Sequence, residues 1–218
     1  MLLPIALNLK DAPCLVVGGG EIGARKVRSL LDCGARVKVV SPQLCEALET
    51  MRADNEYSNL HKFEYSKRVF ECRDCDQMRL VFACTNSRTI NDEIARASQF
   101  FNALCNVADE PRDSDFQNMA VVRRGEITIA ISTGGGSPAL SKRLKTEIEN
   151  AIGDEYAQLL ELMSERRAQL NRAETSQSER AALWHRVLDS DVLELLRRGE
   201  NESAAQLVDA IMFGEPRA

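Results

Sequence analysis

The sequence predicts an α/β protein, in which a doubly wound parallel sheet is followed by a small mixed segment and a helical C-terminal part. Three observations lead to this fold class. Short apolar runs alternate with helical patterns up to residue 107, a glycine cluster joins the first run to the first helix, and only helical periodicity follows Asp154. Strands that alternate with helices imply a parallel sheet with right-handed crossovers. We expect three parts, at residues 1–112, 113–148 and 149–218.

The first part contains five segments predicted to be strands: Cys14–Val17, Arg36–Val40, His61–Tyr65, Leu80–Cys84 and Ala103–Val107. Three segments between these strands have helical spacing: Glu21–Cys33, Leu44–Asn55 and Thr89–Phe101. Gly34 suits the C-cap of the first helix, because glycine enters the left-handed region without strain.

The second part begins after Pro111 and changes in pattern. Phe116–Arg123 and Glu126–Ser132 predict two strands joined by a turn at Gly125. A second glycine-rich stretch then leads into a predicted helix, Pro138–Ala151.

The third part is helical throughout. An apolar stripe marks its first helix: Tyr156, Leu159, Leu160, Met163 and Leu170. Ser176 and Glu179 have the spacing of a capping box. Gly199 and Gly214 end two further helices, Val192–Arg198 and Ala204–Phe213.

Composition excludes several classes of protein. The chain has 218 residues, 44% hydrophobic and 28% charged, which is ordinary for a globular protein. No apolar run approaches the roughly 20 residues of a membrane helix, and MLLPIALNLKDAP lacks the basic start of a signal peptide. We therefore expect a cytoplasmic protein with no membrane partner. The net charge of −5 argues against a nucleic-acid partner.

Seven cysteines are scattered along the chain and are expected to be reduced thiols. Cys72 and Cys75 form a single CxxC, but a structural zinc site needs four ligands and no second pair is evident. We expect no metal site, with a metal or redox role for this pair as the alternative.

The segment Gly18-Gly19-Gly20-Glu21-Ile22-Gly23 fits the pattern G-x-G-x-x-G. Its first glycine permits a tight turn, its second lets the backbone approach a pyrophosphate, and its third lets helix and strand pack closely. The following helix start offers free N–H groups to phosphates. Because the motif follows a strand and opens a helix, it predicts a Rossmann-like dinucleotide site. The alternative is a turn that serves packing alone.

The choice of dinucleotide depends on the end of the second strand. An acid there would bind the ribose 2′-OH and repel a 2′-phosphate, but this chain has Ser41. Ser41 can bond to the hydroxyl but repels nothing, and the next residues, Pro42 and Gln43, do not attract a phosphate. The pattern favours NAD, with weak discrimination against NADP.

A second glycine-rich loop runs from Thr133 through Gly134 and Gly135 to Ser137, which suits a helix N-cap. Basic residues surround it in the sequence: Arg123, Arg124, Lys142, Arg143 and Lys145. These features favour a site for a polyanionic substrate, whereas a solvated helix face is the alternative for the individual lysines and arginines.

Asp109 follows the fifth strand, at the sheet edge where α/β proteins hold their ligands. A carboxylate there can take or give a proton, and the alternative is an aspartate that only stabilises a turn.

Five stretches in this order and spacing resemble one family: VVGGGEIGARKV, ARVKVVSP, VFACTNSRTIN, CNVADEP and AISTGGGSPALSKRLK. They are similar to the siroheme synthase dehydrogenase/ferrochelatase module, the precorrin-2 dehydrogenase family, over residues 1 to about 150. The resemblance implies NAD-dependent oxidation of precorrin-2 to sirohydrochlorin, and it leaves open a second step that inserts Fe²⁺. It also implies a polycarboxylate tetrapyrrole as substrate and a homodimer whose central strands and helical domains exchange contacts.

The resemblance also assigns residues. Asp109 matches an aspartate implicated in dehydrogenation and metal insertion. Positions beside the dinucleotide match Glu21, Ile22, Pro42, Gln43, Thr85 and Asn86, and members often have VSP where Ser41 stands. Thr133 matches a position that is serine in some members and linked there to phosphorylation. The expected substrate contacts are Thr133, Gly134, Gly135, Ser137, Arg124 and Lys142.

Two other functions compete with this enzyme. A non-catalytic NAD sensor would need no carboxylate facing the nicotinamide. A different NAD oxidoreductase, acting on a small acid, usually has a histidine or lysine as its acid/base. The chain has only His61 and His185, and neither is expected to follow a parallel strand at the ligand edge.

Overall fold

A computed structural model describes residues 2–53, 62–108, 110–170 and 176–214 of the chain. Contacts divide the chain into two compact units, Met1–Asn118 and Met119–Ala218. The three-part division expected from the sequence places a further boundary inside the second unit, and that finer division stays a prediction.

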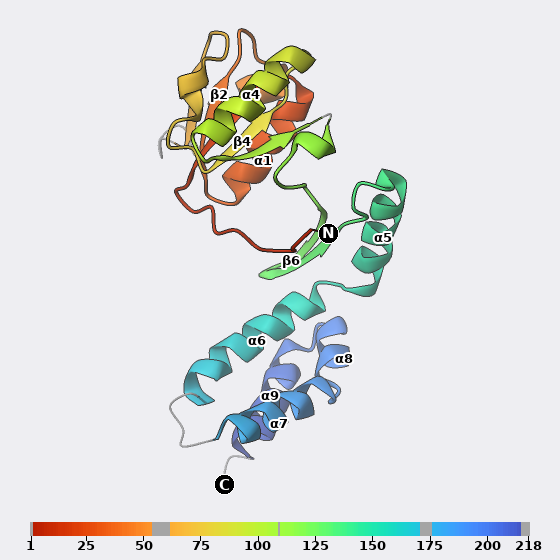
Figure 1. The fold of residues 1–218 in the computed structure, drawn as a ribbon. Helices are drawn as coiled ribbons and strands as arrows, with labels where there is room; N and C mark the ends of the chain where they lie inside the picture. Colours follow the sequence, from red (N-terminus) through yellow and green to blue (C-terminus); the bar gives the residue numbers. More distant parts are fainter. Residues whose placement is uncertain (1, 54–61, 109, 171–175, 215–218) are drawn as a thin grey trace. The chain divides into compact units, whose positions relative to one another are not determined.

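The first unit contains a five-stranded parallel sheet with the order β3-β2-β1-β4-β5 (Figure 1). Its strands are β1 (Pro13–Val17), β2 (Arg36–Val40), β3 (Phe63–Ser66), β4 (Leu80–Ala83) and β5 (Leu104–Val107). Its helices are α1 (Glu21–Asp32), α2 (Glu46–Ala53) and α4 (Arg88–Phe100), with short 3₁₀ helices at η1 (Cys72–Cys75) and η2 (Pro111–Asp113). The strand order reverses at β1, so the ligand crevice of this fold is expected at the carboxyl ends of β1 and β4.

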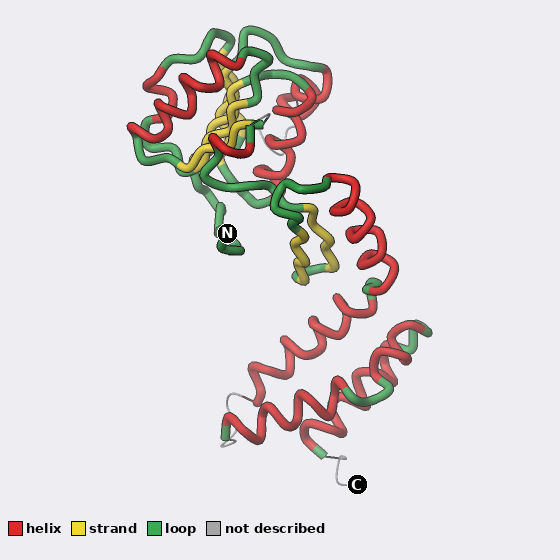
Figure 2. Tube along the Cα trace, turned by 45° about the vertical axis from the view of Figure 1, so that its right-hand side comes forward, coloured by secondary structure: helices red, strands yellow, loops and turns green. Residues whose placement is uncertain are grey.

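Helices cover both faces of this sheet, as the tube in Figure 2 also shows. Alternate residues of β1 enter two different cores because successive side chains of a strand point to opposite faces. Cys14 and Val16 pack in one core with α1 and α2, and Leu15 and Val17 pack in the other with α4. The Rossmann-like fold class expected from the sequence is confirmed.

The end of α1 shows why local sequence was informative here. Gly34 has a φ of 76°, and its N–H donates to the Leu31 carbonyl at 2.8 Å. The Ala35 N–H donates to the Leu30 carbonyl at 3.0 Å. This pair of bonds is a Schellman motif, so the predicted C-cap is confirmed.

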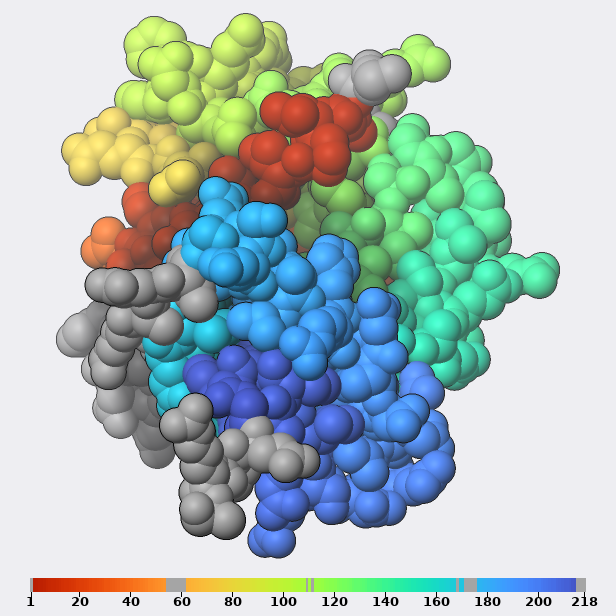
Figure 3. All heavy atoms as spheres, turned by 90° about the horizontal axis from the view of Figure 1, so that it is seen from below, coloured from red at the N-terminus to blue at the C-terminus, as the bar shows by residue number. Residues whose placement is uncertain are grey.

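The second unit starts with an antiparallel pair, β6 (Ala120–Arg124) and β7 (Ile127–Ile131), followed by α5 (Pro138–Ala151). The helices α6 (Glu155–Leu170), α7 (Gln177–Leu188), α8 (Val192–Arg197) and α9 (Asn201–Phe213) follow. Their core contains Leu159, Val187, Val192 and Val208. Figure 3 shows the blue helices of this core packed side by side. The predicted capping box at Ser176 and Glu179 is present.

Several predicted boundaries differ from the structure by a few residues, among them the start of α9, which is Asn201 rather than Ala204, and two of the differences have a clear physical reason. Phe116 was expected to begin a strand, but β6 begins at Ala120 and Phe116 packs edge-on against Phe82, with ring centroids 5.4 Å apart. Its apolar ring gains more from the core of the first unit than from a two-stranded ribbon. Helix α2 begins at Glu46 rather than Leu44, because the Cys45 N–H donates to the Gly19 carbonyl at 2.7 Å. His61 lies outside the described residues.

No helix in the described ranges has both the length and the apolar character needed to cross a bilayer.

Candidate functional site

The first glycine loop lies at the carboxyl end of β1 and is packed against its neighbours. Gly18 has a φ of 115°, and a Cβ there would lie 2.3 Å from the Cys84 carbonyl oxygen. A Cβ on Gly23 would lie 2.3 Å from the Gly18 oxygen. Both positions therefore require glycine so that β4 and α1 can approach the loop closely.

The next two glycines differ from each other. A Cβ on Gly19 would lie 2.0 Å from the Gln43 oxygen, whereas a Cβ on Gly20 would meet no atom within 4 Å. The loop is therefore closed on the side of Gln43 and open at Gly20, where a pyrophosphate can reach the backbone. Gly20 is also the N-cap of α1, and none of the side chains that the structure describes caps this helix. The N–H groups of its first turn are left for an anion, which fits the predicted dinucleotide.

Two further residues of the motif, Glu21 and Ile22, are exposed at the start of α1. Their side chains are accessible beside the loop, as a contact with a dinucleotide requires.

The segment after β2 closes the other side of the loop. Ser41 is only 8% exposed, and its hydroxyl donates to the Gln43 carbonyl at 2.8 Å. The hydroxyl proton of Ser41 is therefore used within the turn of residues 41–43, whose Gln43 carbonyl lies against Gly19. Pro42 and Gln43 are exposed. A contact between the Ser41 oxygen and a ribose hydroxyl stays a prediction.

The turn after β4 is organised by a residue that sequence reasoning missed. Asn91, on α4, is fully buried, and its amide donates to the Thr85 carbonyl at 3.2 Å. The Thr85 hydroxyl and the Asn91 Oδ1 lie 2.7 Å apart. These bonds hold Thr85 at the strand end and leave Asn86 exposed. A polar residue on the buried face of a helix was the signal that could have revealed Asn91.

Lys26 was also missed. It follows Ile22 by one helical turn on α1, and its Nζ lies 5.4 Å from the centre of the Phe82 ring. Burial lowers the pKa of this ammonium. Lys26 is therefore a half-buried ammonium that packs against an aromatic ring of β4.

Asp109, the expected catalytic residue, lies outside the described residues. The residue before it, Ala108, donates its N–H to the Ala83 carbonyl at 3.0 Å, so β5 ends beside β4. Asn106, at that end of β5, is buried and donates to the Phe116 carbonyl at 2.9 Å.

The second glycine loop is a cap for α5. Ser137 is the N-cap and accepts from the Leu140 N–H at 3.2 Å, as predicted. The Thr133 hydroxyl accepts from the Ser137 N–H at 3.3 Å and lies 3.0 Å from the Ser141 hydroxyl. Gly134 donates to the Ser132 hydroxyl at 3.1 Å. Several N–H groups expected to face an anion therefore close the loop itself, and Gly134 and Gly135, with φ of 62° and 83°, shape it.

The structure does not bring Arg124 to this loop. Its guanidinium donates to the carbonyls of Glu149 and Ile152, each at 2.9 Å, where α5 ends. Ser137 caps the other end of this 14-residue helix, about 21 Å away at 1.5 Å per residue. Arg124 instead stabilises the carbonyls that end a helix and are left without intrahelical partners. Proximity in sequence to the glycine loop did not indicate this position because it ignored the direction of α5, and a contact between Arg124 and the substrate stays a prediction.

The three basic residues on α5 differ in their partners. Arg143 pairs with Glu147 at 2.8 Å and Lys145 with Glu149 at 3.6 Å, each one helical turn away. Lys142 is exposed near the glycine loop, and no carboxylate among the described residues lies within ion-pair distance of it. Lys142 is therefore the basic residue here that can meet an anionic substrate.

The CxxC segment contains one buried and one exposed cysteine with an ion-paired aspartate between them. Cys75 is buried 3.6 Å from the Ser98 hydroxyl, and burial raises its pKa to about 11, whereas Cys72 is exposed. Between them Asp74 accepts from Arg68 at 2.7 Å and from Lys38 at 3.1 Å. In the described part of the chain no three His, Cys, Asp or Glu side chains are placed to hold a metal.

Three family models match the chain in succession. A model of NAD(P)-binding domains matches residues 5–120, the sirohaem biosynthesis protein central region matches residues 124–151, and the sirohaem synthase dimerisation region matches residues 155–212. The first of these covers the glycine loop described above.

Relatives agree with these models. The siroheme synthase of Methylococcus capsulatus is 36% identical over 94% of this chain and 42% of its own length. That of Gluconobacter oxydans is 33% identical over 99% of this chain and 45% of its own length. The chain thus spans less than half of these relatives.

A solved structure described as "SirC, precorrin-2 dehydrogenase" matches with a TM-score of 0.77 and 25% identity, over 95% of this chain and 99% of that one. The dinucleotide loop, the three consecutive family regions and this shared architecture lead to one assignment: the chain belongs to the siroheme synthase family, as its NAD(P)-binding, central and dimerisation module.

Proposed function

We propose that the chain is a precorrin-2 dehydrogenase, which oxidises precorrin-2 to sirohydrochlorin with NAD⁺ as the acceptor. The observation that carries the proposal is the glycine loop, closed at Gly19 and open at Gly20 above an uncapped helix start. The likeness to the precorrin-2 dehydrogenase structure over nearly its whole length supports the choice of substrate.

The residues divide the work between cofactor and substrate. NAD⁺ supplies the hydride acceptor. Gly18 to Gly23 hold the pyrophosphate, and Thr85, fixed by Asn91, borders the nicotinamide half of the crevice. Asp109 takes the proton that leaves precorrin-2 when the hydride leaves, so that one hydride and one proton are removed in total.

The preference for NAD over NADP rests on Ser41 and its neighbours. None of Ser41, Pro42 and Gln43 carries a positive charge that would attract a 2′-phosphate. None carries a negative charge either, so discrimination between the two cofactors is expected to be weak.

Substrate recognition is assigned to the α5 loop. Lys142 provides the charge for a tetrapyrrole carboxylate, and Thr133, Gly134, Gly135 and Ser137 shape the surface beside it. Phosphorylation of Thr133 is not part of the proposal, since its hydroxyl already bonds to the Ser137 N–H.

We also propose that the chain acts as a homodimer. Helix α5 buries none of its residues, and Leu140 on it is 47% exposed. The β6–β7 ribbon has only two strands, which is marginal in water without further packing. A second copy would cover these surfaces, in agreement with the match to a dimerisation region. The location proposed for this dimer is the cytoplasm.

One experiment separates these functions. The purified chain is incubated anaerobically with precorrin-2 and NAD⁺, and the absorbance of NADH and sirohydrochlorin is followed. The proposal expects both to rise together, and NADP⁺ to support a slower rise. Fe²⁺ or Co²⁺ is then added, and a metallated spectrum would assign the chelatase step to this chain.

Two outcomes favour the alternatives. Tight NAD⁺ binding without oxidation of precorrin-2 would identify an NAD sensor. Oxidation of a small hydroxy acid but not of precorrin-2 would identify another oxidoreductase. The Gly20→Val variant, in which we expect NAD⁺ binding to be blocked, is the control. NADH formed by this variant would come from a reaction that does not use the glycine loop.

A further inference from the structure

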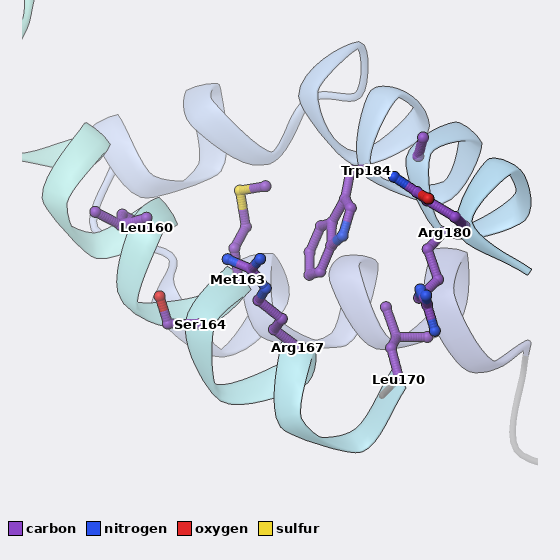
Figure 4. A pocket seen from close by; sticks show the side chains of 9 residues that line it. Leu160, Met163, Ser164, Arg167, Leu170, Arg180 and Trp184 are labelled. Atoms are coloured by element: carbon purple, nitrogen blue, oxygen red, sulfur yellow. The ribbon is translucent and has the colours of Figure 1, made fainter. Parts of the chain in front are cut away.

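The helical part of the second unit contains a cavity between α6 and α7 (Figure 4). Its volume is about 550 Å³, within the range of sites that hold drug-sized ligands. It shares no residue with the cofactor and substrate positions discussed above. Its lining combines an apolar floor with two arginines, one from each helix.

The arginines of the cavity are Arg167 on α6 and Arg180 on α7. Among the described residues neither guanidinium has a carboxylate within ion-pair distance. The neighbouring Arg166 behaves differently, because its Nε donates to Asp209 at 2.9 Å and its Nη1 bonds to Glu165. Within the described ranges, no carboxylate therefore neutralises the charges of the two cavity arginines.

The floor of the cavity is apolar. Figure 4 shows the Trp184 ring and Met163 between Leu160 at one end and Leu170 at the other. Leu170 is only 2% exposed, so this floor continues into the helical core. Arg180 is half-buried beside these apolar side chains, whereas Arg167 is exposed at the edge of the cavity. The planar fork of each guanidinium matches the two oxygens of a carboxylate, and partial burial strengthens such a contact at Arg180.

We propose that this cavity binds an amphipathic dicarboxylate. The apolar body of the ligand covers Trp184 and Met163, and Arg167 and Arg180 each hold one carboxylate. Tetrapyrroles with carboxylate side chains belong to this chemical class, and so do smaller dicarboxylic acids. The site is independent of the proposed dehydrogenation, because it involves neither the dinucleotide loop nor Asp109.

A second copy of the chain is the other occupant to consider, since the dimerisation region matches residues 155–212. A twofold interface brings the same surface of both copies together. If the cavity lay near such an axis, Arg167 and Arg180 of one copy would face the same two arginines of the other copy. Charged residues are also depleted from the cores of interfaces. The charge of the cavity therefore favours an anionic ligand.

The chain offers a local reporter for this site, because Trp184 is its only tryptophan. The full chain is titrated with sebacate, a transparent linear dicarboxylate, and with the uncharged diol of the same length. We expect a saturable change of Trp184 emission with sebacate and none with the diol. Arg167→Gln and Arg180→Gln should each weaken sebacate binding about tenfold, the effect of losing one charge-assisted contact.

Arg186→Gln is the matched control, since Arg186 is an exposed arginine on α7 that does not line the cavity. It should leave the affinity for sebacate unchanged. If a glutamine variant unfolds, as circular dichroism would reveal, Arg167→Lys and Arg180→Lys keep the charge and should lose only part of the affinity. Calorimetric titration with uroporphyrin then identifies the source. Tighter binding than sebacate, weakened by the same substitutions, points to tetrapyrroles, and binding of sebacate alone points to small dicarboxylates.

Three results would overturn the proposal. The first is the absence of a saturable signal with sebacate. The second is an unchanged affinity in the folded Arg167→Gln/Arg180→Gln double variant. The third is a Trp184 emission that follows dimer dissociation on dilution while the dimer takes up no dicarboxylate, because a second copy would then fill the cavity. NAD⁺ binding is measured in the same variants. Its loss or retention tests the proposed dehydrogenase function and not the proposed dicarboxylate site.

Discussion

The sheet of the first unit and the β6–β7–α5 segment of the second differ in how they bury apolar surface. Val16, Val81 and Ile94 are fully buried in the sheet and its helices. Helix α5 is of similar length to α4 but has no buried residue. The sheet therefore has a complete core within one chain. The central segment buries Val122 and Ile131 on its ribbon but leaves α5 with exposed apolar side chains such as Leu140.

This difference separates two kinds of site. The glycine loop lies on a rigid, self-sufficient scaffold, so its geometry is expected to be set by one chain. The α5 loop lies on a segment whose stability we expect to depend on a second copy. Substitutions in the sheet should consequently change cofactor binding or folding, while substitutions on α5 should change assembly first.

The largest effect is expected at Asp109, where the sheet contributes to the chemistry. Asp109→Asn keeps the shape of the side chain but removes its basic charge, so turnover of precorrin-2 should fall about 10²- to 10⁴-fold. Affinity for NAD⁺, measured by calorimetry, should remain that of the parent because the glycine loop is untouched. A variant that turns over at the parent rate would make Asp109 structural.

Substitutions in the glycine loop should distinguish residues that bind the cofactor from residues that the fold requires. Gly20→Val should weaken NAD⁺ binding by about 100-fold or more with an unchanged melting temperature, since its Cβ points into open space. Gly19→Val should instead lower the melting temperature, because its Cβ would lie 2.0 Å from the Gln43 oxygen. Equal effects of both substitutions on stability would contradict this difference.

Substitutions in the β6–β7–α5 segment should change dimer formation. Leu140→Glu places a charge on the exposed face of α5 and should raise the dimer dissociation constant by about 30-fold, equivalent to burial of one leucine side chain. Phe100→Glu is the control, because Phe100 is 77% exposed on the first unit. Analytical ultracentrifugation measures both, and an unchanged dimer in the Leu140 variant would place the interface elsewhere.

The stability of the first unit should depend on pH through Asp74. Burial by itself raises the pKa of this carboxyl, but hydrogen bonds from Arg68, the Glu71 N–H and Lys38 outweigh it and lower the pKa from 3.8 to about 2. A depressed carboxyl pKa stabilises the folded state above the unfolded pKa, and this contribution is lost as pH falls through the folded pKa. At neutral pH it amounts to about 2 kcal/mol.

Denaturant unfolding of the parent should therefore lose this contribution between about pH 4 and pH 2. Asp74→Asn should lower the free energy of unfolding by about 2 kcal/mol at neutral pH and flatten the acid dependence. The same acid slope in parent and variant would mean that another carboxylate is responsible.

The smallest effect is expected at Ser41. Ser41→Ala removes the hydroxyl that donates to Gln43 at 2.8 Å, and should cost about 1 kcal/mol of unfolding free energy. Ser41→Asp tests the cofactor: if the side chain faces the ribose, NADP⁺ binding should weaken more than NAD⁺ binding. Parallel loss of both cofactors would show that Ser41 acts through the turn alone.

Local patterns in the sequence were sufficient for much of this protein. Alternating apolar runs placed the strands, Gly34 and Ser137 marked helix ends, and the spacing of Gly18, Gly20 and Gly23 indicated the dinucleotide loop. These signals are reliable because strand alternation, helix caps and tight turns depend on residues a few positions apart.

Contacts between distant residues were decided only by the tertiary structure. The requirement for glycine at position 19 comes from the Gln43 carbonyl, and the Ser41 proton is used by the same turn. Arg124 lies at the C-terminal end of α5, because the direction of this helix brings the Glu149 and Ile152 carbonyls to its guanidinium. Its short distance in sequence from Thr133 did not indicate this position. Strand order and helix direction decide which side chains meet when a helix or a crossover separates them in sequence. A short stretch of sequence predicts neither the strand order nor the helix direction.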